Sequence, residues 1–272
     1  MIWTQSSQLN RQGNAYFSKG QYSEAHACYV KALELDRRSG DLRAMTATLG
    51  NLGNMCAVSG RRAEAQSYYE EVLALQKRLG DLRGVGTTLS NLGSLRADAG
   101  EWERAQAYYL EALDLMQQTG EESGKAVLYS DLGMLAREQG RYEEAILHYE
   151  RAVTILTRFQ DVAGLSDLWR GKARIYLAWS RLAEAVACCQ TSLALAERAQ
   201  DELRAGGTRY VLAQCYEALG ELEQVLIYLE RVVAMDRKYS LPKLEANERW
   251  LADVQDRVRV RKVAALEKGA SS

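Results

Sequence analysis

The feature that most constrains the fold of this chain is a repeat of 40 residues that runs through most of its length. The tetrapeptide Gly-Asp-Leu-Arg at residues 40–43 returns at residues 80–83, and shortened versions of it return at 120, 160 and 200. A second marker falls midway through each repeat, at Gly20, Gly60, Gly100, Gly140, Ser180 and Gly220. Glycine readily takes the left-handed conformation that ends a helix, and aspartate can cap the next one. Each repeat is therefore predicted to be a helix, a turn and a helix.

Apolar residues between the markers recur at helical spacing. Leu49, Leu52 and Cys56 form such a stripe in one predicted helix, and Tyr69 and Val72 belong to the stripe of the next. A small residue stands at the same place in every first helix, at Gly13, Gly53, Gly93, Gly133, Ala173 and Ala213. Small residues let two helix backbones approach closely. Since neither helix can bury its stripe alone, we expect antiparallel pairs stacked in a row.

The composition excludes several classes of protein. A single proline, Pro242, in 272 residues fits long helices and argues against a fold rich in β-turns. The 35 basic and 36 acidic side chains give no bulk charge that would attract nucleic acid. No stretch reaches the ~18 apolar residues of a membrane span, so membrane insertion is not expected. The five cysteines lack CxxC spacing and the chain starts without a secretory pattern, so we expect a cytoplasmic location.

Three segments carry a more specific resemblance. They are NLGNMCAVSGRRAEAQSYYEEVLALQ from residue 51, NLGSLRADAGEWERAQAYYLEALDL from residue 91 and DLGMLAREQGRYEEAILHYERAVTI from residue 131. Their leucine-glycine pair, turn glycine, alanine, tyrosine and final alanine resemble the tetratricopeptide repeat signature, across roughly residues 5–238. The usual unit of that family has ~34 residues, and the 40-residue unit is similar to that of Pins-type polarity scaffolds and of arrays in bacterial signalling proteins. The resemblance implies an all-α, right-handed superhelical solenoid.

We expect about six repeats and a C-terminal capping helix. The predicted units are residues 1–39, 40–79, 80–119, 120–159, 160–199 and 200–239, followed by a cap at 240–268 and a tail at 269–272. The match weakens in the fifth unit, which has Ala173 and Cys189 at the glycine and tyrosine places, and in the sixth, which has Leu229. The cap should start with Pro242 in its first turn. Its apolar stripe comprises Leu244, Leu251, Val254 and Val258.

The resemblance also implies where a ligand lies, because first helices line the concave groove of such arrays and hold an extended peptide or a helix. Positions about a quarter turn from the buried stripe face that groove. These candidate partner-binding residues are Asn10, Arg11, Asn14, Asn51, Asn54, Asn91, Ser94, Asp131, Arg170, Arg174, Tyr210 and Gln214.

The asparagines of this set have two explanations. Asparagine is a poor helix former, so a series of them inside helices needs a reason. Their amides could pair with the backbone of a bound peptide, or they could join neighbouring repeats by hydrogen bonds.

The groove should become basic in its fifth and sixth units. Arg170 and Arg174 lie one turn apart, with Lys172, Arg137 and Arg209 nearby. They predict an acidic ligand segment there. The alternative is an ordinary solvated helix face, in which the arginines pair with Asp167 or Glu138.

The sequence offers no candidate active site. It contains no phosphate loop, no GxSxG and no HExxH, and its two histidines, His26 and His148, lie far apart in the array. We expect neither a cofactor nor a metal, and no enzyme activity. The leading hypothesis is an adaptor that binds a partner protein in its groove. The alternative is a sensor or regulatory arm of a bacterial signalling system, within a larger polypeptide or complex.

Overall fold

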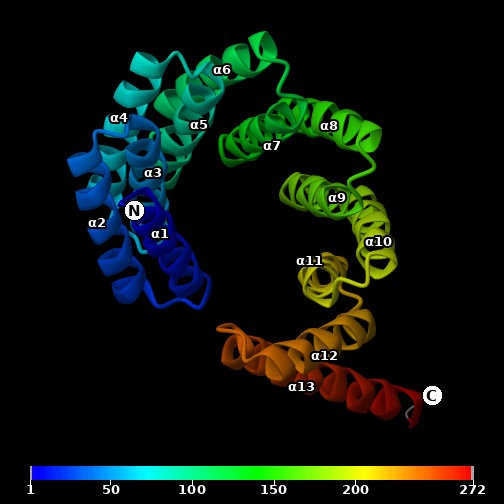
Figure 1. The fold of residues 1–272 in the computed structure, drawn as a ribbon. Helices are drawn as coiled ribbons and strands as arrows, with labels where there is room; N and C mark the ends of the chain where they lie inside the picture. The colour runs from blue at the N-terminus through cyan, green and yellow to red at the C-terminus, as the bar shows by residue number, and fades with distance from the viewer. Residues whose placement is uncertain (1, 271–272) are drawn as a thin grey trace. The chain divides into compact units, whose positions relative to one another are not determined.

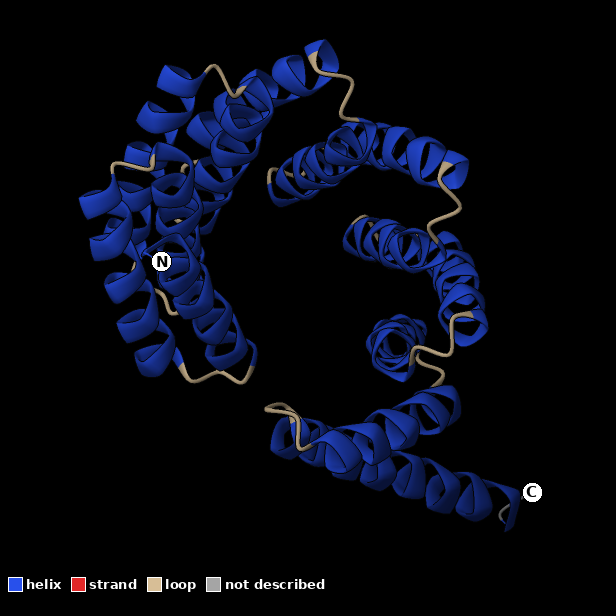
Figure 2. Cartoon of the chain, in the orientation of Figure 1, coloured by secondary structure: helices blue, strands red, loops and turns tan. Residues whose placement is uncertain are grey.

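A computed structural model describes residues 2–270 of the chain, and the side chains of residues 5–264. All regular secondary structure in this range is helical, and short loops join the helices (Figure 2). The helices are α1 (Ile2–Ser18), α2 (Tyr22–Ser39), α3 (Leu42–Val58), α4 (Arg62–Leu79), α5 (Leu82–Asp98), α6 (Trp102–Gln118), α7 (Glu122–Glu138), α8 (Tyr142–Arg158), α9 (Val162–Ala178), α10 (Leu182–Arg198), α11 (Glu202–Leu219), α12 (Leu222–Tyr239) and α13 (Leu244–Ala270). The predicted all-α repeat array is confirmed.

The helices form two compact units, residues 1–131 and 132–272, and α7 contributes to both. In the first unit α1 packs on α2, α3 on α4 and α5 on α6, and each pair packs on the next (Figure 1). In the second unit α9 pairs with α10 and α11 with α12, and α13 packs on α12. We call the odd-numbered helices α1 to α11 the A helices and their partners the B helices. We propose that each A–B pair is one of the six predicted repeats.

The joints between helices confirm the predicted caps. Gly40 has a φ of 69°, and the Asp41 carboxylate that follows it accepts hydrogen bonds from the backbone amides of Arg43 and Ala44 at 2.9 and 3.1 Å. Asp81, Asp161 and Asp201 cap their A helices in the same way. The left-handed conformation is kept where glycine is missing, at Gln160, Ser180, Gln200 and Ser240. A side chain with a β-carbon costs about 1 kcal/mol at such a position, so these four joints are strained.

A tyrosine ring packs on the small residue of the A helix in the first repeats. A β-carbon on Gly53 would lie 2.6 Å from the ring of Tyr69, far inside van der Waals contact. The same relation holds between Gly13 and Tyr29 at 2.5 Å, between Gly93 and Tyr109 at 2.6 Å, and between Gly133 and Tyr149. Glycine is therefore required because the B-helix ring lies directly against the A-helix backbone.

The fifth and sixth repeats change both partners of this contact. Ala173 and Cys189 lie in one buried cluster, and Ala213 and Leu229 lie in the next. The side chains of cysteine and leucine are shorter than that of tyrosine and lack the ring atoms that lie against the glycines, so the A helix has room for a methyl group. The two departures from the repeat signature in each of these units are therefore one correlated packing change.

The C-terminal helix covers the end of the array, as predicted. Val254 and Val258 are buried against α12, and Leu251 is half-buried beside them. The predicted start of the cap was wrong, because α13 begins at Leu244 and Pro242 lies in the turn before it. Proline fits the second position of such a turn, which the amide of Leu244 closes on the carbonyl of Leu241 at 3.1 Å. The helix runs to Ala270, and residues 271–272 of the predicted tail lie outside the described part of the chain.

Candidate functional site

The exposed positions next to the small residues of the A helices differ between the two units. In the first unit the tyrosine that packs on each glycine also bonds the following side chain. The Tyr29 hydroxyl donates to Asn14 Oδ1 at 2.6 Å, and the Tyr69 hydroxyl donates to Asn54 Oδ1 at 2.7 Å. Ser94 and Tyr109 share a hydrogen bond of 3.2 Å. These predicted groove residues are thus bound to the B helix of their own repeat.

The second row of amides joins neighbouring repeats. Asn51 Nδ2 donates to Asn10 Oδ1 at 3.1 Å, and Asn10 Nδ2 donates to Thr48 Oγ1 at 2.7 Å. Asn91 Nδ2 lies 3.5 Å from Asn54 Oδ1, at the limit of a hydrogen bond. These are the repeat-to-repeat bonds of the second explanation for the asparagines. A role of the same amides in peptide binding stays a prediction.

Asp131 continues this row at the fourth repeat. Burial raises the pKa of its carboxyl group to about 7, and the Asp131 charge contributes to the raised pKa of Tyr109. The carboxylate therefore replaces the neutral amide of Asn51 and Asn91 at a cost in stability. At the N-terminal end of the row, Arg11 is exposed, and its guanidinium donates to the carbonyl of Ser7 at 3.4 Å.

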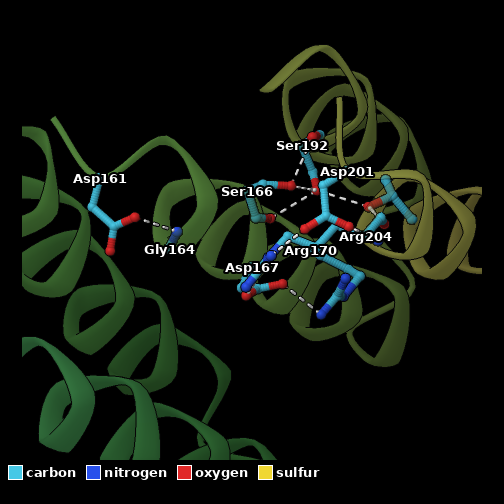
Figure 3. Close-up of polar contacts among 9 residues, drawn as sticks. Asp161, Gly164, Ser166, Asp167, Arg170, Ser192, Asp201 and Arg204 are labelled. Carbon is cyan, nitrogen blue, oxygen red and sulfur yellow. Dashed lines mark hydrogen bonds and ion pairs between the residues drawn. The ribbon is translucent and has the colours of Figure 1, made fainter. Parts of the chain in front are cut away.

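Most of the predicted basic residues are already paired. Arg170 donates to Asp167 Oδ1 at 2.8 Å, and Arg204 binds the other oxygen of that carboxylate at 3.0 Å and also contacts Asp201 (Figure 3). Figure 3 also shows Ser166 and Ser192 bonded where α9 meets α10. Surface ion pairs such as those of Arg170 and Arg204 stabilise the fold by at most about 1 kcal/mol each.

The other predicted cations are bound as well. Arg137 pairs with Glu138, and Arg209 pairs with Glu197 at 2.9 Å. Lys172 does not belong to the predicted basic face, because its side chain is buried against Trp169 and its ammonium pairs with Glu150 at 3.3 Å. Lys172 stands one residue before Ala173 in the buried stripe, so it shares the core-facing side of α9.

Arg174 is the exception in this cluster. It is exposed on α9, and it has no hydrogen bond or ion pair to any residue whose side chain is described. Partial burial of its guanidinium and the charges of Arg170 and Arg137 lower the pKa of Arg174, although the group stays protonated in water. Its own repeat has Cys189 in place of the tyrosine that binds Asn14 or Asn54 in the first unit. Among the described side chains Arg174 is therefore a cation without an ion pair, and it lies near the cations Arg170 and Arg137 and the rings of Tyr149 and Tyr210.

A pocket opens beside Arg174 within the second unit. Its volume is about 320 Å³, and it is lined by α9, α11, α12, the turn before α13 and the start of α13. Tyr210 forms part of the wall, with the ammonium of Lys243 5.4 Å from its ring centre and the Trp250 ring edge-on behind it at 5.6 Å. The pocket brings together two predicted residues, Arg174 and Tyr210. Gln214 lies on α11 one turn beyond Tyr210 and is half-buried.

Sequence reasoning missed the other polar residues of this pocket. Asp236, Lys243 and Asn247 come from α12, the turn and α13, all of which were interpreted as structural. The repeat register could have indicated that Asp236 lacks a partner that Asp36 has. Asp236 stands 200 residues after Asp36, and the residue 200 positions after Ser6 is Gly206.

The repeats match a known protein family. The sequence matches the tetratricopeptide repeat family over residues 4–78, 84–158 and 165–238. The chain belongs to the tetratricopeptide repeat (TPR) family. No curated protein matches the chain in sequence. Arrays of this family present extended surfaces to protein partners, so the fold is that of an interaction scaffold.

Solved structures with the same fold come from several organisms. BtubC from P. vanneervenii is 24% identical, with a TM-score of 0.64 over 73% of this chain and 82% of that one. Aspartyl phosphate phosphatase F from Bacillus subtilis is 12% identical, with a TM-score of 0.73 over 93% and 71% of the two chains. A Rap protein complexed with Competence and Sporulation Factor is 16% identical, with a TM-score of 0.67 over 92% and 75%. At these identities the likeness concerns the TPR fold alone.

Two properties of the described residues bear on the class of site. No group of three or more His, Cys, Asp or Glu side chains within them is placed to hold a metal ion. None of the described helices is long and apolar enough to cross a membrane. The vicinal cysteines of this TPR array, Cys188 and Cys189, are both buried. Burial raises the pKa of the Cys188 thiol, and a hydrogen bond with Cys215 together with burial raises the pKa of the Cys189 thiol.

Proposed function

We propose that this TPR protein is a cytoplasmic, non-enzymatic adaptor that binds an extended peptide or a helix of a partner protein along the A-helix faces of its repeats. The observation that carries the proposal is Arg174, an exposed guanidinium without a carboxylate partner among the described side chains. An arginine without an ion pair, beside the like charges of Arg170 and Arg137, gains free energy when an acidic group arrives. The Rap protein complexed with Competence and Sporulation Factor supports a ligand-binding role for an array of this fold.

The proposed contact surface is strongest in the fifth and sixth repeats. Arg174, Tyr210 and Gln214 lie there, and Arg170 adds positive charge although Asp167 binds it. We propose an acidic ligand segment at this end. In the first unit Asn51 and Asn91 offer weaker contacts, since their amides already bond to neighbouring repeats, and Arg11 is an exposed cation at the start of the array.

A second function, a sensor or regulatory arm of a bacterial signalling system, has support from one comparison. A signal transduction ATPase with numerous domains and a tetratricopeptide repeat sensor, from Pyrococcus horikoshii, matches 90% of this chain with a TM-score of 0.72 at 13% identity. This chain covers 38% of that one. A repeat array of this size thus occurs as one part of a signalling protein, and a larger assembly that contains this chain would favour the second function.

Photo-crosslinking tests where the partner binds. A photoreactive amino acid is placed at Gln214, on an A helix, and separately at Ile227, on the B helix α12, where the side chain is 46% exposed. Each variant is expressed in the native host, and the adducts are compared by mass spectrometry. We expect one specific adduct at Gln214 that is lost when Arg174→Ala is added. An adduct at Ile227 alone would show that the B-helix side is the interface.

A further inference from the structure

Two buried aspartates at equivalent places in the array have different surroundings. Asp36 is 2% exposed, and each of its carboxylate oxygens accepts a hydrogen bond from a hydroxyl group. Ser6 donates to Oδ1, and Thr48 donates to Oδ2 at 2.7 Å. Asp236 is 3% exposed and accepts one hydrogen bond, from Asn247 Nδ2 to Oδ2 at 2.7 Å. No described side chain donates to Asp236 Oδ1. Oδ1 is open to solvent, because it is not among the fully buried polar atoms of the described residues that lack a partner, and Asp236 lines a pocket. This oxygen can therefore accept a hydrogen bond from a ligand in the pocket.

Gly206 explains why the protein supplies no such donor. Gly206 holds the place of Ser6, and the thioether of Met235 lies where a β-carbon on Gly206 would stand. No side chain on that residue can therefore reach Asp236 in this arrangement. The loss of the hydroxyl coincides with the pocket, because Gly206, Met235 and Asp236 all line it.

The pocket combines three kinds of surface. Asp236 and Asn247 form a buried polar end, and Val232, Met235 and Leu241 form an apolar wall. Arg174 and Lys243 bring positive charge from two other elements. The volume of about 320 Å³ is at the small end of the range for ligand sites and fits an amino-acid side chain with its backbone groups.

We propose that this pocket binds an α-ammonium group that carries an apolar side chain, as found in a free amino acid or in the first residue of a peptide. The ammonium group donates to Asp236 Oδ1 and restores the second hydrogen bond that Ser6 gives to Asp36. The apolar side chain packs on Val232, Met235 and Leu241. The carboxylate of a free amino acid, or the carbonyl of a peptide, faces Arg174 and Lys243.

The charges favour such a ligand over a simple anion or cation. Asp236 carries one negative charge, while Arg174 and Lys243 carry two positive charges. A simple anion would bind at the cations but meet repulsion from the Asp236 carboxylate. A simple cation would satisfy Asp236 but meet repulsion from Arg174 and Lys243. A group with an ammonium and an adjacent carboxylate or carbonyl complements both ends.

Calorimetric titration with four small probes tests the proposal and separates the two sources. L-leucine, L-leucinamide, N-acetyl-L-leucine and the dipeptide leucyl-glycine are each titrated into the full chain. We expect L-leucine or the dipeptide to bind, and N-acetyl-L-leucine, which has no ammonium group, to bind at least about tenfold more weakly. Stronger binding of the dipeptide and the amide indicates a peptide terminus, and stronger binding of L-leucine indicates a free amino acid.

Two variants locate the binding in this pocket. Asp236→Asn should weaken the best probe by at least about tenfold, because the charge-assisted bond is lost. Asp36→Asn is the matched control, since it removes the equivalent charge from the first unit and should leave probe binding unchanged. Arg174→Ala keeps the fold, because no described side chain bonds to Arg174, and should weaken L-leucine more than L-leucinamide.

The proposal is overturned by either of two results. One is that none of the four probes binds the parent protein at millimolar concentration. The other is that the best probe binds Asp236→Asn and Arg174→Ala as tightly as it binds the parent. Circular dichroism of each variant shows that the fold is retained, and Arg174→Ala keeps the test valid if Asp236→Asn does not fold.

Discussion

The first three repeats and the last two use the same positions for different purposes. In the first unit Tyr29, Tyr69 and Tyr109 pack on glycines of the A helices. Their hydroxyl groups also form hydrogen bonds with the side chain one residue after each glycine, so these polar side chains already have partners within the protein. In the fifth and sixth repeats the rings are replaced by Cys189 and Leu229. A residue such as Arg174 then has no tyrosine to bind. The loss of one core ring thus changes a surface residue from a structural group into one available to a ligand.

The buried joints between repeats show the same contrast. Asp36 is satisfied by Ser6 and Thr48, whereas Asp236 keeps one hydrogen bond and faces a pocket. The buried aspartate of the first unit therefore has all its donors within the protein, and the equivalent aspartate at the end of the second unit does not. Variants that change one unit at a time test this difference.

The largest effect is expected at the cap. Val254 is fully buried against α12, so Val254→Asp places an unpaired carboxylate in an apolar cluster and should destabilise the second unit by at least about 3 kcal/mol. Amide hydrogen exchange followed by mass spectrometry reports the two units separately. Val260→Asp is the control, because Val260 on the same helix is 66% exposed and should have little effect. Equal loss of protection in α1–α6 would show that the units do not unfold independently.

The glycine-tyrosine contact gives the next largest effect. Gly53→Ala brings a methyl group against the ring of Tyr69 and should lower the free energy of unfolding by about 1–3 kcal/mol. Adding Tyr69→Cys reproduces the Ala173–Cys189 combination of the fifth repeat. The double variant should be more stable than the sum of the single changes by about 1 kcal/mol in a urea double-mutant cycle. Strict additivity would refute the idea that the two positions change together for packing reasons.

The row of amides predicts a pH effect at Asp131. The pKa of this carboxyl is about 7 in the folded protein, against about 3.9 in an unfolded chain. The folded state therefore binds an extra proton between these values, and stability falls as the pH rises from about 4 to about 7. Asp131→Asn, which copies Asn51 and Asn91, should raise stability at pH 8 by about 1–3 kcal/mol and reduce the slope. Thermal melts at pH 5 and pH 8 measure this. Asp98→Asn, at an exposed residue, should leave the slope as it is.

The smallest effect is expected at the left-handed joints that lack glycine. Gln200 has a φ of 54°, so Gln200→Gly should stabilise the second unit by about 0.5–1 kcal/mol. The reverse change in the first unit, Gly80→Gln at a φ of 67°, should destabilise by a similar amount. Chemical unfolding curves compare the two. If Gln200→Gly is neutral or harmful, then the glutamine side chain makes a compensating contact.

The sequence predicts the fold well because its turn markers, its helix caps and its packing positions all indicate the same architecture. Stacked helix pairs are indicated by the markers every 20 residues, by caps such as Asp41 and by small residues such as Gly53. The structure contains all three features. The site is less predictable, because exposure on an A helix does not say whether a side chain already has a partner. Asn54 and Arg170 look free in a helical register but are bound to Tyr69 and Asp167. Such pairs join residues whose rotamers the periodicity of the sequence does not determine.

Partner binding by Arg174 and Asn54 variants separates a residue available to a ligand from one bound within the protein. The partner segment mapped by crosslinking is titrated against Arg174→Ala and against Asn54→Ala, at low and at high salt. Arg174→Ala should weaken binding by at least about tenfold and remove most of its salt dependence, with the melting temperature unchanged. Asn54→Ala should leave affinity unchanged and lower stability by about 1 kcal/mol, because the Tyr69 hydroxyl loses its acceptor. The opposite pattern, with affinity lost in Asn54→Ala and kept in Arg174→Ala, would contradict the claim that the loss of the tyrosine contact frees this face for a ligand.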